Sequence, residues 1–176
     1  MRRKSLSGVA CPIARTLDVI GDWWSLLIVR DALRGMRRFS EFEKSLGVSK
    51  NILTRRLRTL VKQGILERAP ATDGSAHREY RPTAKGRGLF PVLVALGQWG
   101  QENLATPGGR RVTLVDRDQH RPVRKLEVRA SDGRLLGPGE TMMTRLDWRS
   151  CSDGRSRRKN AALTGSWRYG APRGGR

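Results

Sequence analysis

Apolar residues recur at helical spacing in the first part of the chain, and polar or glycine residues separate the runs. The first run predicts a helix that opens at Pro12, a favoured first helical residue, and ends at Gly21. Its apolar residues are expected to form an inner face: Ile13, Leu17 and Ile20. The second run, from about 23 to 33, is apolar on most sides. It therefore predicts a helix at the centre of a small core.

A short strand and two helices joined by a tight turn are expected next. The strand covers 36–39, and Ser40 with Glu43 has the spacing of a capping box at the start of a helix. Gly47 can take the left-handed conformation that ends this helix, and Ser49 can cap the following one. The pattern predicts a helix-turn-helix.

The second of these helices has one apolar and one basic face. Its buried stripe is expected to be Leu53, Leu57 and Leu60. Arginine can bind guanine edges bidentately and asparagine can bind adenine, so the other face suits a major groove. The candidate DNA contacts are Ser49, Lys50, Asn51, Thr54, Arg55, Arg58 and Lys62. The alternative is a solvated charged surface. Arg56 sits beside the leucine stripe, where it can pack or bind a phosphate.

A basic hairpin follows. Gly64 ends the helix, a strand is expected at 65–68, and a turn signal at 73–74 leads to a returning strand at 78–82. Tyr80 is expected to point inward. Arg78 and Arg81 are candidate phosphate or minor-groove contacts, and His77 is interpreted as an exposed loop histidine rather than a base contact. The helices and the hairpin together predict a winged helix-turn-helix, which is an α+β fold that is mainly α.

The last helix is expected from a cap at Thr83 to about Leu104, with a first half weakened by Gly86, Gly88 and Pro91. Its apolar stripe consists of Leu89, Val92, Leu93, Leu96 and Trp99. The stripe can dock on the chain's own helices or form a dimer interface. We favour the interface, because helix-turn-helix proteins usually need two copies to cover a pseudo-palindromic site. The expected interface residues are Ile13, Leu17, Leu93, Leu96 and Trp99.

Composition favours a polyanionic partner. The chain of 176 residues carries a net charge of +20. The thirty residues 147–176 hold eight basic and two acidic residues, so the rest still carries +14. Neither histidine, His77 or His120, has a metal-ligand or catalytic context, so we expect no enzyme, no metal and no cofactor. No apolar run approaches a membrane span, and two distant cysteines fit a reducing cytoplasm, with the protein on the nucleoid.

Four segments are expected from these patterns. Residues 1–8 form a flexible basic arm, and 9–104 form the DNA-binding and dimerisation domain. Residues 105–146 form a small β-rich extension, with strand-like alternation at 111–115 and 126–129. Residues 147–176, rich in Arg, Gly and Ser, are expected to be disordered.

Several motifs resemble the HxlR family of bacterial transcription regulators. The resemblance rests on the run from Cys11 to Arg30 and on the motifs at 38–42, 53–57 and 79–86, and it extends over about 9–104. It implies a compact winged-helix homodimer whose first and last helices form the interface, and it implies repression or activation of nearby genes. We expect a repressor that binds double-stranded DNA at an inverted repeat. The alternative is a basic binder of RNA or nucleoid DNA without sequence preference.

Cys11 is a candidate sensor. The resemblance implies that, in some members of the family, oxidants or electrophiles act on the cysteine that matches Cys11. Its position before Pro12, at a helix N-terminus and one turn from Arg15, favours a thiolate. The alternative is a small covered residue that caps the helix and is inert.

Overall fold

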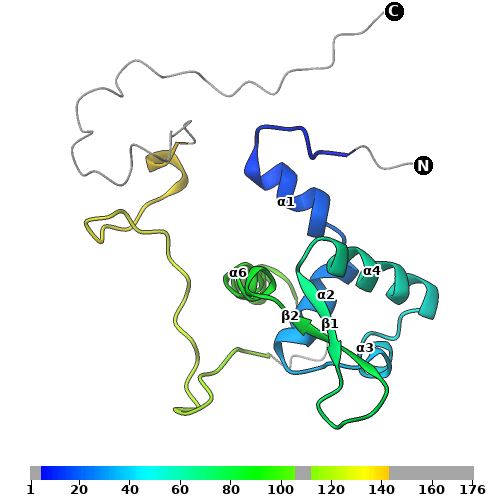
Figure 1. Ribbon diagram of the computed structural model, residues 1–176. Helices are drawn as coiled ribbons and strands as arrows, with labels where there is room; N and C mark the ends of the chain where they lie inside the picture. The colour runs from blue at the N-terminus through cyan, green and yellow to red at the C-terminus, as the bar shows by residue number, and fades with distance from the viewer. Residues whose placement is uncertain (1–4, 106–111, 143–176) are drawn as a thin grey trace, which may run out of the picture. The chain divides into compact units, whose positions relative to one another are not determined.

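The computed structural model describes residues 5–105 and 112–142, which include a helical body and one hairpin (Figure 1). The elements in chain order are α1 (Pro12–Ile20), α2 (Trp23–Leu33), α3 (Phe39–Leu46), α4 (Lys50–Lys62), β1 (Leu66–Pro70), β2 (Arg78–Pro82), α5 (Ala84–Arg87), α6 (Phe90–Asn103) and a 3-10 turn at Pro138–Glu140. The winged helix-turn-helix expected from the sequence is thereby confirmed.

The core lies around α2, as its evenly apolar sequence predicts. Helices α3, α4 and α6 and strand β2 all pack on α2 (Figure 1). The apolar side chains without solvent exposure come from α2, α3 and α4: Ile28, Val29, Ala32, Phe42, Leu53, Leu57 and Leu60. Burial of such side chains contributes about 1.5–3 kcal/mol each, so this cluster dominates the stability of the fold.

Two details at the start of the helix-turn-helix differ from expectation. Residues 36–39 form no strand; the segment accepts only one backbone hydrogen bond from the hairpin, which Tyr80 N donates to Arg37 O at 2.8 Å. Helix α3 begins at Phe39 with Arg38 as its N-cap residue. Glu41, at the third helical position, stabilises this end, because its Oε2 accepts from the backbone N–H groups of Arg37 at 2.6 Å and Arg38 at 2.8 Å. The Ser40–Glu43 capping box is therefore wrong, because the helix starts too early for Ser40 to precede it. Gly47, at φ 60°, ends α3 as predicted.

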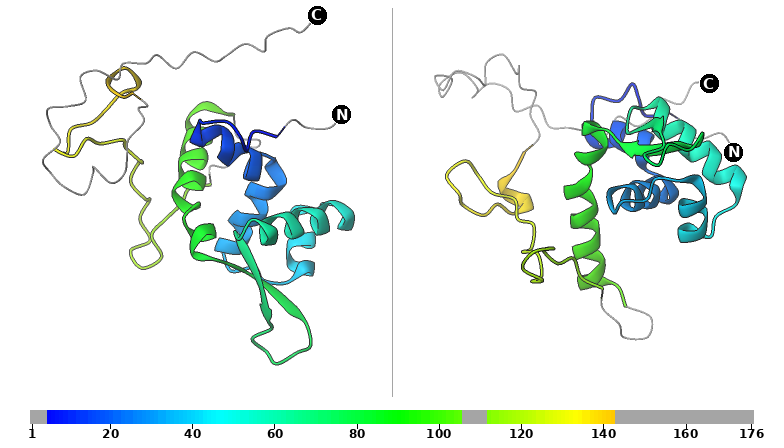
Figure 2. Two further views of the ribbon diagram at one scale, coloured as in Figure 1. Left: turned by 45° about the horizontal axis from the view of Figure 1, so that its top comes forward. Right: turned by 60° about the horizontal axis from the view of Figure 1, so that its bottom comes forward.

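The hairpin is a two-stranded antiparallel sheet in which Leu66 pairs with Pro82 and Pro70 with Arg78. The first strand thus begins and ends slightly later than 65–68, whereas the second matches its prediction. Tyr80 is half-buried, packs against the core and meets Phe42 edge-on with ring centroids 6.4 Å apart. The hairpin projects beyond the helices as the wing (Figures 1 and 2).

The predicted last helix is broken in two. Thr83 caps α5, since its hydroxyl accepts from Gly86 N at 3.1 Å, and α6 begins anew at Phe90. A side chain at Gly86 would clash with the neighbouring backbone, because a Cβ at this position would lie 2.2 Å from the backbone oxygen of Ile65. Figure 2 shows α6 running as a separate column beside the other helices of the body.

Residues 112–142 contain isolated bridges instead of the expected strands. Val115 pairs with Pro122 and Arg129 with Leu135. Tight turns close both hairpins after only a few residues, so neither extends into a ladder. The chain divides into two compact units after Leu126, so residues 112–126 belong to the unit that holds the helices.

The ends of the chain are described only in part. Of the expected basic arm, residues 5–8 are described, and the Ser5 hydroxyl donates to Asp18 Oδ2 on α1 at 2.8 Å. The expected disordered tail, 147–176, lies outside the described residues. No helix in the described ranges combines the length and the apolarity that crossing a lipid bilayer would need.

Candidate nucleic-acid interface

Helix α4 separates its apolar and polar residues onto opposite faces. Leu53, Leu57 and Leu60 have no solvent exposure. Of the candidate contacts, Thr54 is half-buried and the others are exposed: Ser49, Lys50, Asn51, Arg55, Arg58 and Lys62. Lys50 lies 4.0 Å from Glu43 Oε1 in an ion pair, and the rest of this polar and cationic surface of α4 is accessible within the described chain. Such a surface has the donors and acceptors that base edges in a major groove pair with.

Arg56 is held inside the protein. Its Nε lies 3.0 Å from Asp22 Oδ1, and both side chains are largely covered. Asp22 also caps α2, because its carboxylate accepts from Ser25 N at 3.0 Å. Of the two roles left open for Arg56, the structure supports packing: the side chain fastens α4 to the first turn of α2.

A buried carboxylate makes a second connection, which sequence reasoning missed. Asp31 on α2 has no solvent exposure; it accepts from Ser45 Oγ on α3 and from Arg30 Nε, each at 2.8 Å. A buried carboxylate is tolerated only when it is paired and hydrogen-bonded, as here. This contact fixes α3 against α2. The one signal in the sequence was the acid itself inside an apolar helix.

The two arginines of the wing lie in different environments. Arg78 is exposed, and no acidic partner is found for it within the described residues. Arg81 is half-buried; its guanidinium pairs with Glu79 Oε2 at 3.1 Å and donates to Pro70 O at 3.1 Å. Arg81 thus has a structural task within the wing, and Arg78 is the freer of the two cations. His77 is exposed in the loop, as interpreted.

Two wing carboxylates are stabilised in their charged form. The backbone N–H and hydroxyl of Thr72 donate to Glu79, which is nearly buried, and lower its pKa. Ser75 and Arg38 donate to Asp73 and lower its pKa to about 2. Because Arg38 precedes α3, its ion pair with Asp73 fastens the wing turn to the helix-turn-helix. No sequence pattern predicted either contact.

The expected dimer residues divide between surface and core. The exposed fractions are 60% for Ile13, 46% for Leu17, 50% for Leu96 and 58% for Trp99. Ile13 and Leu17 therefore do not form an inner face, since only Ile20 of that set is buried in the core. Leu93 is half-buried and packs on the core of its own chain. The exposed stripe of α6 instead includes Val92, at 43%.

Cys11 is the N-cap residue of α1 and is half-buried, with a free thiol. Arg15, expected to act on it, directs its guanidinium to the backbone oxygens of Val9 at 3.0 Å and Ala10 at 2.8 Å. Cys151 lies outside the described residues. Across the described ranges, no group of three or more His, Cys, Asp or Glu residues is arranged to hold a metal ion.

Comparison with known proteins extends the resemblance. Rv3095 of Mycobacterium tuberculosis (strain ATCC 25618 / H37Rv), an uncharacterized HTH-type transcriptional regulator, is 41% identical over 102 residues, which cover 58% of this chain and 65% of that relative. The crystal structure of PA1607, a candidate transcription factor, is 54% identical with a TM-score of 0.76, and the match covers 81% of this chain and 99% of that one. The redox regulator HypR in its oxidized form is 33% identical with a TM-score of 0.50, over 55% of this chain and 100% of that one.

The family assignment rests on a match to a family model. Residues 19–107, half of the chain, match the model of the HxlR-like helix-turn-helix family. This range holds α2, the helix-turn-helix, the wing and α6, and it begins within α1. The chain belongs to the HxlR-like helix-turn-helix family.

Proposed function

We propose that the protein is a sequence-specific DNA-binding transcriptional regulator. The observation that carries this is the exposed face of α4, where Asn51, Arg55 and Arg58 stand opposite three fully buried leucines. The leucines and Arg56 anchor α4 in the protein, and a different set of side chains on α4 is exposed and available to contact DNA. The exposed Arg78 on the wing supplies a phosphate contact beside it.

The regulator acts as a homodimer on an inverted repeat. Exposed apolar side chains on α1 and α6 support this part of the proposal: Ile13, Leu17, Val92, Leu96 and Trp99. Large apolar side chains gathered on a surface mark sites of association. Two copies of α4 then read half-sites centred about 10–10.5 bp apart, or a multiple of that spacing. The dimer represses by occupying its operator and excluding other proteins from it.

Oxidants or electrophiles that reach Cys11 are the proposed effectors. The half-buried thiol lies on α1, one of the two helices assigned to the interface. HypR, a relative by structure, is a redox regulator. A bulky adduct or a bridge at Cys11 would change the packing of the two subunits, and hence the spacing of their α4 helices.

Selection of bound fragments from random DNA tests the proposed function. The full chain is mixed with random duplexes, bound fragments are amplified over several rounds, and the enriched sequences are aligned. We expect an inverted repeat that competes well against random DNA at moderate salt. Equal binding of all sequences, with affinity falling steeply as salt rises, would favour a sequence-blind nucleic-acid binder instead.

A further inference from the structure

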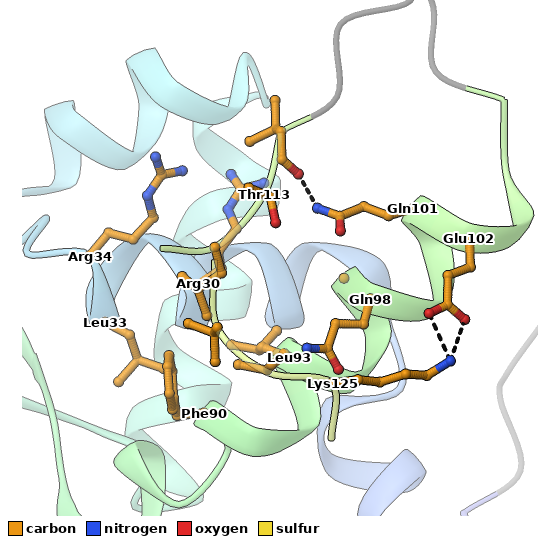
Figure 3. Close-up of a pocket in the computed structure, with 15 residues that line it drawn as sticks. Arg30, Leu33, Arg34, Phe90, Leu93, Gln98, Gln101, Glu102, Thr113 and Lys125 are labelled. Atoms are coloured by element: carbon orange, nitrogen blue, oxygen red, sulfur yellow. Dashed lines mark hydrogen bonds and ion pairs between the residues drawn. The ribbon is translucent and has the colours of Figure 1, made fainter. Parts of the chain in front are cut away.

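A pocket lies between α2, α6 and the segment that follows α6 (Figure 3). Its volume of 510 Å³ falls in the range of about 300–1,000 Å³ that is typical of small-molecule sites. All of its lining residues lie between Arg30 and Lys125, within one compact unit of the chain. None of the candidate DNA contacts lines it.

The outer wall of the pocket is attached to α6 by polar side chains one turn apart. Gln98 donates to Arg124 O at 3.0 Å and accepts from Leu126 N at 2.9 Å. Gln101 donates to Val112 O, and Glu102 pairs with Lys125 Nζ at 2.8 Å (Figure 3). Both ends of the segment 112–126 are thus fastened to one face of α6.

Between its attached ends the wall forms a small hairpin. Val123 N donates to Leu114 O at 3.0 Å, and Asp116 N donates to Arg121 O at 2.8 Å. The turn is closed by Asp116 Oδ1, which accepts from two backbone N–H groups. Leu114 and Val123 therefore line the pocket from a defined backbone.

The lining combines an apolar floor with a cationic edge. Leu33, Phe90, Leu93 and Val94 come from α2 and α6, and the arginines at 30 and 34 lie along the opposite side from Gln101 and Glu102 (Figure 3). Glu102 is paired with Lys125 and Arg30 with Asp31, which leaves Arg34 as the lining cation that has no acidic partner within the described residues. Arg30 binds Asp31 through Nε alone, and the Arg34 guanidinium has no hydrogen-bond acceptor within the described residues. An occupant with an apolar body and one anionic group satisfies both parts of the lining.

The pocket and the exposed stripe use opposite faces of α6. At 100° per residue, the pocket residues Phe90, Val94 and Gln101 project to one side of the helix, and Val92, Leu96 and Trp99 project to the other, about 180° away. A molecule in the pocket therefore leaves the proposed dimer face free.

We propose that this pocket binds a small organic anion with an apolar, aromatic-sized body, and that the anion regulates DNA binding. Its charged group binds Arg30 and Arg34, and its body lies on Phe90 and Leu93. Arg30 is also bonded to Asp31, which holds Ser45 on α3, so the charge of the occupant acts on the side chains that position the helix-turn-helix. Only this regulatory effect rests on the proposed function; binding of the anion does not.

A matched pair of fluorescent probes tests binding on the full chain. 8-Anilinonaphthalene-1-sulfonate has an aromatic body with one anionic group, and N-phenyl-1-naphthylamine has the same body without the charge. We expect the sulfonate to bind at one molecule per chain. Arg34→Gln should weaken the sulfonate about tenfold, the effect of losing one charge-assisted hydrogen bond, and leave the neutral probe unchanged.

A filling variant shows where the probe binds. Gly97 lines the pocket with nothing within 4 Å of an added Cβ, so Gly97→Leu is expected to place its side chain in the pocket. It should abolish binding of both probes, whereas Ala95→Leu, on α6 but outside the lining, should change neither. Equal sulfonate binding by wild type and Gly97→Leu, with both folded by circular dichroism, would overturn the proposal, as would a wild type that binds neither probe.

The regulatory part has a separate readout. Affinity for the selected DNA is measured with and without saturating sulfonate probe, in wild type and Arg34→Gln. We expect the probe to change the DNA affinity of wild type at least a few-fold. In Arg34→Gln the same change should require a probe concentration that is higher in proportion to the weaker probe binding. Saturable binding that leaves DNA affinity unchanged would overturn the regulatory part and keep the site. Absence of any DNA binding would instead count against the proposed function, since the fluorescence result stands independently.

Discussion

The carboxylate of Asp22 lies 3.0 Å from Nε of Arg56, so the residue that caps α2 also holds α4. Arg55 and Arg58, its neighbours on α4, are exposed. Arginines that are close in sequence therefore have different tasks. Substitution of Arg56 should lower stability, and substitution of the other two should change recognition.

Replacing Arg55 or Arg58 by alanine should cost about 1–3 kcal/mol of binding to the selected DNA and relax the preference at one position, because a base contact is lost. Arg78→Ala should weaken binding to all sequences alike and reduce the salt slope, because a phosphate contact is lost. Affinity is measured by fluorescence anisotropy on selected and scrambled duplexes. A uniform loss in all three variants would mean that α4 does not read bases.

Leu96→Glu should convert the proposed homodimer to a monomer, because it places a charge in the apolar interface assigned to it. Light scattering at micromolar concentration gives the mass directly. The matched control is Leu135→Glu, which replaces a leucine of similar exposure, 52% against 50%, in the unit after Leu126. A wild type that is already monomeric, or a dimer that survives Leu96→Glu, would contradict the proposed interface.

Cys11→Ser should remove the response to oxidants. Treatment with diamide or a quinone is expected to change the operator affinity of wild type, because the modified thiol lies at the proposed interface. The variant should bind the operator equally before and after treatment. If mass spectrometry finds Cys11 unmodified and the affinity of treated wild type unchanged, the residue is only the cap of α1.

Stability should fall in acid, and Glu79 should account for part of the loss. Its pKa is lowered from an ordinary 4.5, chiefly by the bond from Thr72 N. A carboxylate with a lowered folded-state pKa contributes stability above its unfolded-state pKa and loses it as pH falls through the folded-state value. Urea midpoints from pH 6 to 3 should therefore decline less steeply in Glu79→Gln than in wild type. Glu67→Gln, at an exposed site on the neighbouring strand, should follow wild type, and an unchanged slope in Glu79→Gln would contradict the assignment.

Gly86→Ala should destabilise the protein by about 1–3 kcal/mol, the usual cost of forcing an atom into a packed site. The new Cβ would stand 2.2 Å from the Ile65 oxygen, and backbone must move to admit it. Gly97→Ala is the matched control: it lies inside α6, meets no atom within 4 Å, and should stabilise by about 0.5–1 kcal/mol through helix propensity. Urea unfolding measures both. Equal stability of the two variants would show that α5 shifts freely away from Ile65.

Local patterns were sufficient for most of the fold. The spacing of Leu53, Leu57 and Leu60 is sufficient to predict α4, and Gly47 is sufficient to predict the turn between α3 and α4. Each of these signals involves residues within a few positions of one another. The start of α3 was misplaced because Ser40 and Glu43 have the spacing of a capping box. The bonds are instead made by Glu41, which occupies the third helical position two residues earlier than expected.

Contacts between distant residues could not be predicted in this way. Asp31 bonds to Ser45 fourteen positions away, and Gln98 bonds to residues more than twenty-five positions away. Such pairs become visible only when the helices are packed. For the same reason periodicity placed Leu93 with the exposed stripe, although it packs on its own core.

Every buried apolar residue in the described part of the chain falls between Ile20 and Val94, whereas the wall attached by Gln98, Gln101 and Glu102 contributes none. Insertions, deletions and substitutions after α6 are therefore expected to have little effect on folding. Evolution can vary this wall, and with it the molecules that the pocket admits, while the half of the protein that faces DNA is inherited unchanged. Divergence among relatives should accordingly be fastest beyond α6, and exchanging that segment between two of them should transfer effector preference without transferring operator preference.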